Sequence, residues 1–416
     1  MKILILGCGG REYAIGQKLL ENTVVSQLYF ALGNGSTAQI GIIIPWDRSK
    51  VLCISAKIQM IGLAILGSET LLVEGIVDTF QAVRFKIFGL HHQTYQLDGS
   101  KVLAKAFMKK YDVRIATYES FSYHPQARNH LEQVDYPVVI KASELAVCKG
   151  VVIASDRTRA QAALEAMMKK KNFGTAGCEI VIEAFLQGYE ASFLSIFNRK
   201  QILPFFSAKD HKKIDEGETG LNTGEMGVIT PNLYMNEETW VDFQQNIIQP
   251  ILQGLLAEKW TFAGVIFFGL MFTVKGVYIL GYNLIIGDPE TRAILQLMES
   301  YFLELIQKAL CGEDLSISWG QVHACCVVMA SGGYPEKYKK GKTLLSGLYQ
   351  LICPHYIVGV EKKDGQWITS SGRVFKHRRY RPLCTRSSRV GRSRGEKYFL
   401  RSSLFPTRYL ALTPPF

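Results

Sequence analysis

The sequence lacks the features that mark secreted, membrane-spanning or zinc-held proteins. Its nine cysteines are scattered, with one adjacent pair at Cys325 and Cys326 and no CxxC motif. This usage is typical of reduced thiols in the cytoplasm and argues against a disulfide or zinc framework. No apolar run approaches about 20 residues, so we expect no membrane span. The opening residues MKILILGCG lead straight into a glycine turn and are too short for a signal peptide.

Acidic residues are nearly missing from the last part of the chain. Residues 374–416 contain eleven Lys or Arg and a single acid, Glu396, so +10 of the formal net charge of +12 belongs to this tail and +2 to the rest. A nucleic-acid patch should be built into a fold or a repeat, so we expect no nucleic-acid partner. The composition changes abruptly after Phe375 and no strand or helix period is sustained, which favours a shifted reading frame. The alternative is an Arg-rich arm that binds RNA or anionic surfaces.

The first hundred residues alternate between apolar strands and helices. A chain of 416 residues is too long for one core, so two to four domains are expected. Strands are predicted at 2–6, 27–31, 51–54, 63–66 and 86–88, and helices at 13–21 and 72–83. This alternation predicts a parallel sheet with crossovers. The glycine turn after the first strand lies where such sheets bind anions, although a merely tight turn would have the same sequence.

The middle of the chain contains two segments of candidate binding residues. Strands at 137–142 and 151–155 flank a short loop, and Lys141 and Lys149 suggest a hairpin that folds over a nucleotide; two solvated lysines are the alternative. Residues 209–227 are dense in Gly, Asp, Glu, Asn and Thr, which predicts a long loop that binds sugar hydroxyls, phosphate or an amine rather than a disordered one. Strands follow at 264–273 and 276–283, then an acidic GDPET turn and a helix over 291–311.

A series of short motifs occurs in one order along residues 1–375. The motifs are GCGGRE (7–12), GNGST (33–37), LVEGIVDTF (72–80), KIFG (86–89), QLDGSK (96–101), VVIKA (138–142), KGVVIA (149–154), VIEAFLQGYEASF (181–193), DHK (210–212), TGLNTGEMG (219–227), FAGVIFFGLM (262–271), GDPET (287–291) and ASGGYP (330–335). In this order they resemble the phosphoribosylamine–glycine ligases, also called glycinamide ribonucleotide synthetases, of the ATP-grasp superfamily.

The resemblance implies an α/β fold of several domains. We expect an N-terminal parallel-sheet domain that precedes the ATP-grasp domain (1–101), a two-lobed ATP-grasp domain (102–296) and a small, incomplete α+β C-terminal domain (297–375). A basic, poorly ordered tail would follow at 376–416.

The resemblance also implies a reaction. ATP would phosphorylate the carboxylate of glycine, and the amine of 5-phosphoribosylamine would attack the glycyl phosphate to give glycinamide ribonucleotide, ADP and phosphate in purine biosynthesis. Such transfer depends on positioning and on charge neutralisation by lysines and Mg²⁺ or Mn²⁺. The implied partners are the two small substrates, and the implied state is a cytoplasmic monomer or weak dimer.

Site residues follow from the matching motifs. The resemblance implies catalytic roles for Asp288, Glu290 and Lys149, and nucleotide contacts for Lys105, Lys141, Glu183, Phe185, Leu186 and Glu190. It implies substrate contacts for Gly9, Gly10, Asp210, Lys212, Asn222, Thr223 and Gly224, and a metal contact for Asn283.

Several positions depart from the family pattern, which makes this chain resemble a degenerate member. Gly281 stands where the family has the glutamate that binds magnesium, and Ile285 stands where it has an arginine. Glu225 replaces a glycine, and it is strained by about 1 kcal/mol or more if that position needs a positive φ. An impaired or inactive relative that only binds nucleotide or sugar phosphate is therefore the alternative to a working ligase. A nucleic-acid binder that uses the basic tail is a third reading.

Overall fold

The N-terminal part forms a parallel sheet, as predicted. The computed structural model describes residues 1–45, 49–144, 150–169, 177–217, 219–260, 262–343, 355–357 and 359–381. Within these residues the sheet has the order β3-β2-β1-β4-β5, and its pairs are parallel. Its strands are β1 (Lys2–Gly7), β2 (Gln27–Leu32), β3 (Ile42–Ile44), β4 (Leu63–Leu66) and β5 (Ile87–Phe88). The helices of this part are α1 (Gly10–Leu20), α2 (Ser49–Ile58), α3 (Glu69–Val73), α4 (Ile76–Ala82) and α5 (His92–Gly99), with a short 3-10 turn η1 (Thr37–Gln39).

One predicted strand in this region is wrong. Residues 51–54 lie inside helix α2, where Leu52, Cys53 and Ala56 are buried and Ile54 is exposed. Buried positions spaced by three or four residues are typical of a helix that packs on one side. The four-residue run VLCI was too short to separate a strand from a buried helical segment.

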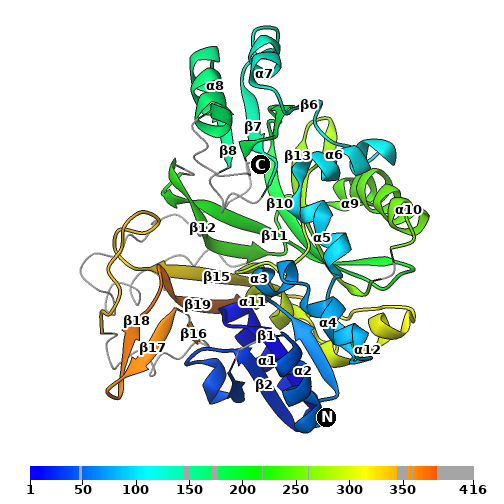
Figure 1. Cartoon of the computed structure of the whole chain (residues 1–416), viewed down its shortest axis with the longest axis vertical. Helices are drawn as coiled ribbons and strands as arrows, with labels where there is room; N and C mark the ends of the chain where they lie inside the picture. The colour runs from blue at the N-terminus through cyan, green and yellow to red at the C-terminus, as the bar shows by residue number, and fades with distance from the viewer. Residues whose placement is uncertain are drawn as a thin grey trace.

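A small lobe lies at the top of the molecule in Figure 1. It is an antiparallel sheet in the order β6-β9-β7-β8 with two helices beside it. The strands are β6 (Tyr118–Phe121), β7 (Val138–Ala142), β8 (Val151–Ala154) and β9 (Ile180–Ala184). The helices are α7 (His124–His130) and α8 (Arg157–Leu164), which continues into η2 (Glu165–Lys169). Their alanines and the inner valines and isoleucines of the sheet form a separate core.

A large sheet occupies the centre of the described structure. Its order is β14-β13-β10-β11-β12-β15-β19-β16. The strands are β10 (Tyr189–Phe197), β11 (Ile202–Asp215), β12 (Thr219–Thr230), β13 (Gly264–Thr273), β14 (Gly276–Asn283), β15 (His323–Ala330), β16 (His355–Ile357) and β19 (Arg373–Arg381). The helices beside it are α6 (Lys101–Lys110), α9 (Glu237–Phe243), η4 (Gln244–Ile248), α10 (Gln249–Ala257), α11 (Glu290–Leu297) and α12 (Phe302–Cys311). A separate hairpin, β17 (Val360–Lys363) and β18 (Gln366–Thr369), lies at the lower left of Figure 1.

Two predictions from the sequence differ from the structure of the large sheet. The segment 209–227, predicted as a loop, is mostly the end of β11 and the start of β12, which pair in an antiparallel ladder with irregular register at His211 and Lys213. The expected tail boundary at Phe375 falls inside β19, because residues 376–381 continue the strand and pair with β15. Residues 382–416 lie outside the described part of the chain.

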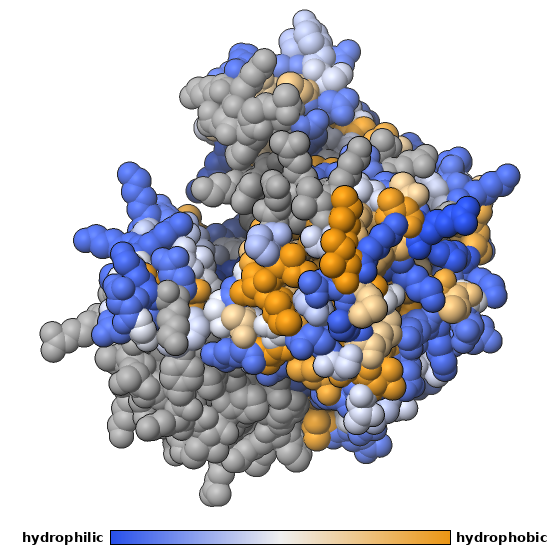
Figure 2. Space-filling view, turned by 60° about the horizontal axis from the view of Figure 1, so that its bottom comes forward, coloured by the Kyte–Doolittle hydropathy of each residue, from blue (hydrophilic) through white to orange (hydrophobic). Residues whose placement is uncertain are grey.

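The surface of the N-terminal part mixes apolar and charged groups. Figure 2, in which the lower end of Figure 1 comes forward, shows apolar groups between hydrophilic ones. The large apolar side chains exposed on this part include Ile42, Ile43, Ile54, Ile58 and Met60. Among the described residues, no helix is both long and apolar enough to cross a membrane.

Candidate active site

Two buried lysines share one glutamate between the small lobe and helix α6. Lys105 lies on α6, Lys141 on β7 and Glu183 on β9. Glu183 Oε1 is 3.2 Å from Lys105 Nζ and 2.9 Å from Lys141 Nζ. The helix begins where the Ser100 side chain accepts a hydrogen bond from the Leu103 amide, which fixes the turn before Lys105. One carboxylate cannot neutralise two ammonium groups, so the cluster has a surplus positive charge.

This surplus charge is suited to a phosphate. Lys105 is 2% exposed, and its ammonium lies 3.2 Å from Glu183 Oε1 but has no geometrically satisfied hydrogen bond to any described residue. Burial lowers the pKa of Lys105 to about 8, and the Glu183 charge only partly offsets that effect. An anion beside Lys105 would accept the unused donors and favour the charged form. The residues present therefore fit the phosphates of a nucleotide.

A β-bulge connects this cluster to strand β14. Gly269 pairs with Gly281 but Leu270 pairs with Ile279, so Leu280 is the extra residue of the bulge. Its carbonyl oxygen accepts a hydrogen bond of 3.2 Å from Lys141 Nζ. Bulges often re-aim groups next to active sites. Gly281 thus directly follows the residue that binds a candidate phosphate lysine.

Position 281 has room for a side chain. A Cβ atom added to Gly281 would meet no heavy atom within 4 Å. Asn283, at the end of the same strand, is exposed. Magnesium in proteins is usually held by carboxylates together with substrate phosphates. With one neutral amide and no carboxylate at these two positions, strand β14 does not fit the magnesium site that the resemblance implied.

The carboxylate of Asp98 lies beside the end of β14. Asp98, on α5, accepts a hydrogen bond of 2.8 Å from the Leu284 amide. Burial raises the pKa of Asp98 to about 7, a rise to which the charge of Glu69 adds, while the bond from Leu284 and the charge of Lys101 oppose it.

The glycine turn after β1 is built around a buried glutamate. Glu12 Oε2 accepts a hydrogen bond of 2.7 Å from the Gly9 amide. Cβ atoms at Gly7, Gly9 and Gly67 would lie within 3 Å of the Glu12 carboxylate, so the glycines leave the space that it fills. Gly10 is the first residue of α1. The Gly9 amide is therefore already committed to Glu12.

The same turn contacts the segment after β14. Arg11 Nη1 donates to the carbonyl of Ile286 at 2.7 Å, and Arg11 Nε is 3.3 Å from Glu12 Oε1. The charge of Asp288 is among the causes that raise the pKa of Glu12, after burial. The first strand–helix turn and the GDPET turn therefore meet, although about 275 residues separate them in the sequence.

The β11–β12 hairpin contributes a chain of ion pairs. Lys212 Nζ is 2.6 Å from Glu190 Oε2 and 3.1 Å from Asp210 Oδ2. Burial alone would raise the pKa of Asp210, but the charge and hydrogen bond of Lys212 outweigh burial and hold it below the ordinary value. The structure thus joins Glu190, a predicted nucleotide contact, to two predicted substrate residues.

Asp210 also faces two glutamates. Side-chain oxygens of Asp210, Glu225 and Glu290 all lie within 4.8 Å of one another. Burial, followed by the Asp210 charge, raises the pKa of Glu290 to about 7. Burial and the charges of Glu290 and Asp210 raise the pKa of Glu225 well above its ordinary value. Nearby, Asp288 forms an ion pair of 2.7 Å with the buried Arg292.

The C-terminal part holds the backbone beside Glu225. The Tyr334 hydroxyl accepts a hydrogen bond of 2.9 Å from the Gly224 amide, and Arg373 donates to the Gly224 carbonyl. Arg373 also donates to the Asp288 carbonyl at 3.3 Å. Thr223 accepts from the Glu225 amide at 3.0 Å. These bonds hold Glu225 at a φ of 77°, so the condition under which the sequence analysis expected strain is met.

The remaining predicted residues are less closely tied to these clusters. Phe185 and Leu186 follow β9 directly, and Phe185 is exposed. Asn222 is exposed on β12, opposite Lys213. Lys149 lies outside the described residues.

Several residues of these clusters, among them Glu12, Glu225, Tyr334 and Arg373, were not predicted site residues. Glu12 and Glu225 were seen only as parts of motifs, and Tyr334 and Arg373 lie in the C-terminal segment. The carboxylate of Glu12, three residues after a glycine turn, was a usable signal because capping boxes have this spacing. No local pattern could have shown that Arg373 reaches Gly224, since this contact spans 149 residues.

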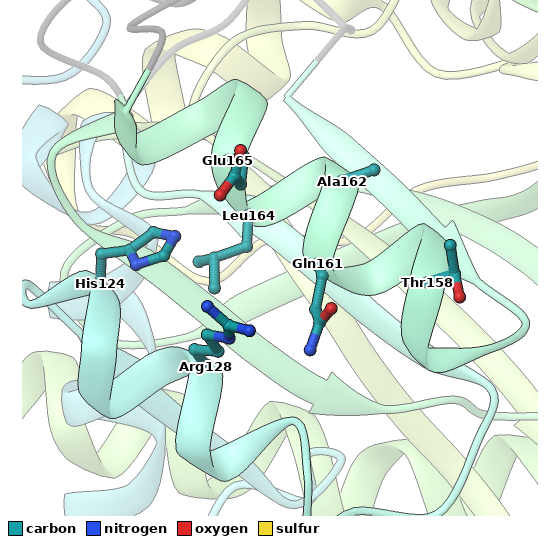
Figure 3. A pocket seen from close by; sticks show the side chains of 7 residues that line it. All are labelled: His124, Arg128, Thr158, Gln161, Ala162, Leu164 and Glu165. Atoms are coloured by element: carbon teal, nitrogen blue, oxygen red, sulfur yellow. The ribbon is translucent and has the colours of Figure 1, made fainter.

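A separate hollow lies in the small lobe. It has a volume of about 270 Å³ and is lined by His124, Arg128, Thr158, Gln161, Ala162, Leu164 and Glu165. Figure 3 shows these side chains on α7, on α8 and at the start of η2. Burial, followed by the charge of Lys169, lowers the pKa of His124. None of these seven residues belongs to the clusters above or to the predicted site.

Comparisons with known proteins show the family to which the chain belongs. Profiles of three domains of phosphoribosylglycinamide synthetase match the chain: the N domain over residues 1–98, the ATP-grasp (A) domain over 99–291 and the C domain over 324–382. The chain is 47% identical over 384 residues to the phosphoribosylamine–glycine ligase of Fusobacterium nucleatum, covering 90% of both chains. It is 44% identical over 379 residues to that of Clostridium acetobutylicum, covering 90% of this chain and 91% of the other.

A solved structure is similar over almost the whole length. The crystal structure of phosphoribosylamine–glycine ligase from Thermotoga maritima superposes with a TM-score of 0.86 at 28% sequence identity, covering 98% of this chain and 99% of that one. The α/β fold, with its parallel N-terminal sheet and antiparallel ATP-grasp sheets, is thereby confirmed. The chain belongs to the phosphoribosylamine–glycine ligase family, a family of ATP-grasp carbon–nitrogen ligases.

Proposed function

We propose that this chain ligates glycine to 5-phosphoribosylamine, with ATP converted to ADP and phosphate, to form glycinamide ribonucleotide in purine biosynthesis. The observation that carries the proposal is the pair of buried lysines on Glu183, one of which binds the bulged carbonyl of Leu280. ATP supplies the phosphoryl group that activates the glycine carboxylate. An oxygen of that carboxylate takes the phosphoryl group and ADP leaves; the amine then attacks the acyl carbon, phosphate leaves and the amine loses a proton.

The proposed roles of the nucleotide-binding and catalytic residues follow from their positions. Lys105 and Lys141 neutralise the nucleotide phosphates, because their shared glutamate leaves a surplus positive charge. Glu183, Phe185, Leu186 and Glu190 lie along the strand ends where adenine and ribose would bind. Asp288, Glu290 and Lys149 are the proposed catalytic residues, and of these Asp288 and Glu290 lie within the described part of the chain.

The two small substrates bind on the other side of Lys212. Its ammonium pairs with Glu190 toward the nucleotide and with Asp210 toward the carboxylate cluster. Gly9, Gly10, Asn222, Thr223 and Gly224 complete this pocket. The protein acts as a cytoplasmic monomer or weak dimer, with no nucleic-acid partner.

A specific observation favours a second candidate, nucleotide binding without ligation. Strand β14 has no carboxylate at position 281, and loss of a group that stabilises the transferring phosphoryl costs on the order of a thousandfold in rate. Labelled glycine separates the two candidates. Ligation predicts that label enters a ribonucleotide product only when Mg·ATP and freshly made phosphoribosylamine are both present. Tight nucleotide binding with no labelled product after prolonged incubation would support the second candidate and contradict the first.

A further inference from the structure

Three carboxylates converge on one point in the hairpin region. Asp210 comes from β11, Glu225 from β12 and Glu290 from the first turn of α11, and their oxygens lie within 4.8 Å of one another. Asp210 and Glu290 are buried, whereas Glu225 is partly exposed. Two of the three carboxylates are therefore buried, and the third is partly accessible to solvent.

Two of these carboxylates form no ion pair with any residue that the structure describes. Glu290 is 1% exposed, and neither of its oxygens accepts a hydrogen bond from another residue in the described part of the chain. A buried carboxylate without a donor is costly, so its position suggests a missing partner. No ion pair of Glu225 or Glu290 occurs within the described residues either.

The nearby cations are engaged with other groups. Lys212 pairs with Asp210 and Glu190. Arg292 pairs with Asp288. Arg373 donates to the carbonyls of Gly224 and Asp288. Since Lys212 already pairs with Asp210, Glu225 and Glu290 are the two carboxylates of the cluster that form no ion pair with a described residue.

We propose that Asp210, Glu225 and Glu290 bind one divalent cation with oxygen ligands, such as Mg²⁺, Mn²⁺ or Ca²⁺. Opposite ligands across one ion are about 4.2 Å apart for Mg²⁺ and about 4.8 Å apart for Ca²⁺. The observed spread of up to 4.8 Å matches these separations with little or no movement of the side chains. A divalent ion balances two unmatched carboxylates, whereas a substrate ammonium would balance one.

Binding of Mn²⁺ alone, without nucleotide, tests the site directly. Free Mn²⁺ is followed by electron paramagnetic resonance during titration of the full chain, beside Glu225→Gln and Asp215→Asn. Asp215 is the matched control, because it is an exposed carboxylate at the end of the same strand and lies outside the cluster. We expect one Mn²⁺ per natural chain, binding at least tenfold weaker in Glu225→Gln and unchanged in Asp215→Asn. Failure of the natural chain to bind Mn²⁺, or equal binding by Glu225→Gln, would overturn the proposal.

Thermal melting provides a second measurement that does not depend on catalysis. A cation that binds only the folded state raises the melting temperature as its concentration exceeds the dissociation constant. MnCl₂ should raise the melting temperature of the natural chain and of Asp215→Asn, but not that of Glu225→Gln. Methylammonium chloride at the same ionic strength should leave all three unchanged. An equal rise with methylammonium would show an ammonium site instead. Because no substrate is present, either result stands apart from the ligation proposed above.

Discussion

Glu225 combines a left-handed backbone with a carboxylate that faces two others. Its φ of 77° is one that residues with a side chain adopt at a cost of about 1–2 kcal/mol. The bonds from Thr223, Tyr334 and Arg373 to its neighbourhood hold that conformation. A strained residue retained among like charges is expected where it contributes to binding.

Glu225→Gly should therefore stabilise the protein in the absence of divalent cations. The change removes the left-handed strain and one of three like charges, and these gains exceed the extra entropy of an unfolded glycine, roughly 0.5–1 kcal/mol. We expect a gain of about 1 kcal/mol in the free energy of unfolding, measured by urea titration with EDTA present. Glu225→Gln, which keeps the strain and removes the charge, should gain less. A loss of stability in Glu225→Gly would contradict the assigned strain.

Asp98 gives a stability that depends on pH. Because the folded pKa of about 7 lies above the ordinary value for an aspartate, folding favours its protonated form. This contribution is complete below about pH 4 and is lost as pH rises through about 7. Asp98→Asn keeps an acceptor for the Leu284 amide and removes the titration.

The stability of Asp98→Asn relative to the natural chain should rise with pH. Between pH 5.5 and 8.5 we expect the difference in free energy of unfolding to shift by about 2 kcal/mol in favour of the variant. Parallel urea titrations at both pH values give this difference, and other titrating groups cancel between the two proteins. A difference that stays constant with pH would show that Asp98 is not perturbed.

At the scale of elements, strand β19 and the turn at Tyr334 hold the hairpin in place. Arg373→Met removes the donors to the Gly224 and Asp288 carbonyls but keeps an apolar stem. Charged hydrogen bonds contribute about 1.5–3 kcal/mol each. We expect a lower melting temperature and a KM for phosphoribosylamine raised about tenfold, equivalent to 1.4 kcal/mol, with the KM for ATP within twofold of the natural value.

Tyr334→Phe is the milder companion of this change. It removes one neutral hydrogen bond, to the Gly224 amide, and should cost about 1 kcal/mol. Steady-state kinetics with each substrate varied in turn compares the two variants. Equal increases in both KM values for Arg373→Met would indicate a general loosening of the fold and contradict a local role in the pocket.

The elements that the sequence predicted well are those with a clear apolar pattern. Strands such as 63–66 and 264–273 appear at the predicted residues, because every position or every second position is apolar. The strand predicted at 51–54 failed because a four-residue apolar run fits either period. The segment 209–227 was predicted as a loop because it is rich in polar residues. It forms strands because β12 pairs with both β11 and β15, and this pairing leaves no local pattern in the sequence. The helix predicted over 291–311 is two helices, since Met298 is extended.

At the scale of the whole molecule, the clusters are assembled from segments that are far apart in sequence. The Arg11–Ile286, Lys141–Leu280 and Arg373–Gly224 contacts span between 139 and 275 residues. The family motifs implied site roles for Asp210 and Glu290, but only the folded arrangement shows that Glu225 faces both of them. Such contacts leave no local period in the sequence.

The C-terminal boundary makes a prediction about the fold as a whole. Residues 376–381 pair with β15, so a chain that ends at Phe375 loses six positions of the ladder, whereas one that ends at Arg381 keeps them. We expect the chain ending at Phe375 to melt about 5 °C or more below the chain ending at Arg381. Differential scanning calorimetry of both proteins measures this. Equal melting temperatures would show that residues 376–381 do not stabilise the folded chain.

We propose that phosphoryl transfer occurs at the bulge of β14 and is slowed by the missing carboxylate at position 281. The measurement that tests this most directly is ADP release with Mg·ATP, glycine and freshly made phosphoribosylamine, for the natural chain, Gly281→Glu and Gly281→Gln. A Cβ atom at position 281 meets no heavy atom within 4 Å. We predict slow release by the natural chain that requires both co-substrates, a rate higher by about a hundredfold or more in Gly281→Glu, and no comparable gain in Gly281→Gln. Release that is absent from all three proteins, or that Gly281→Glu fails to increase, would contradict the account.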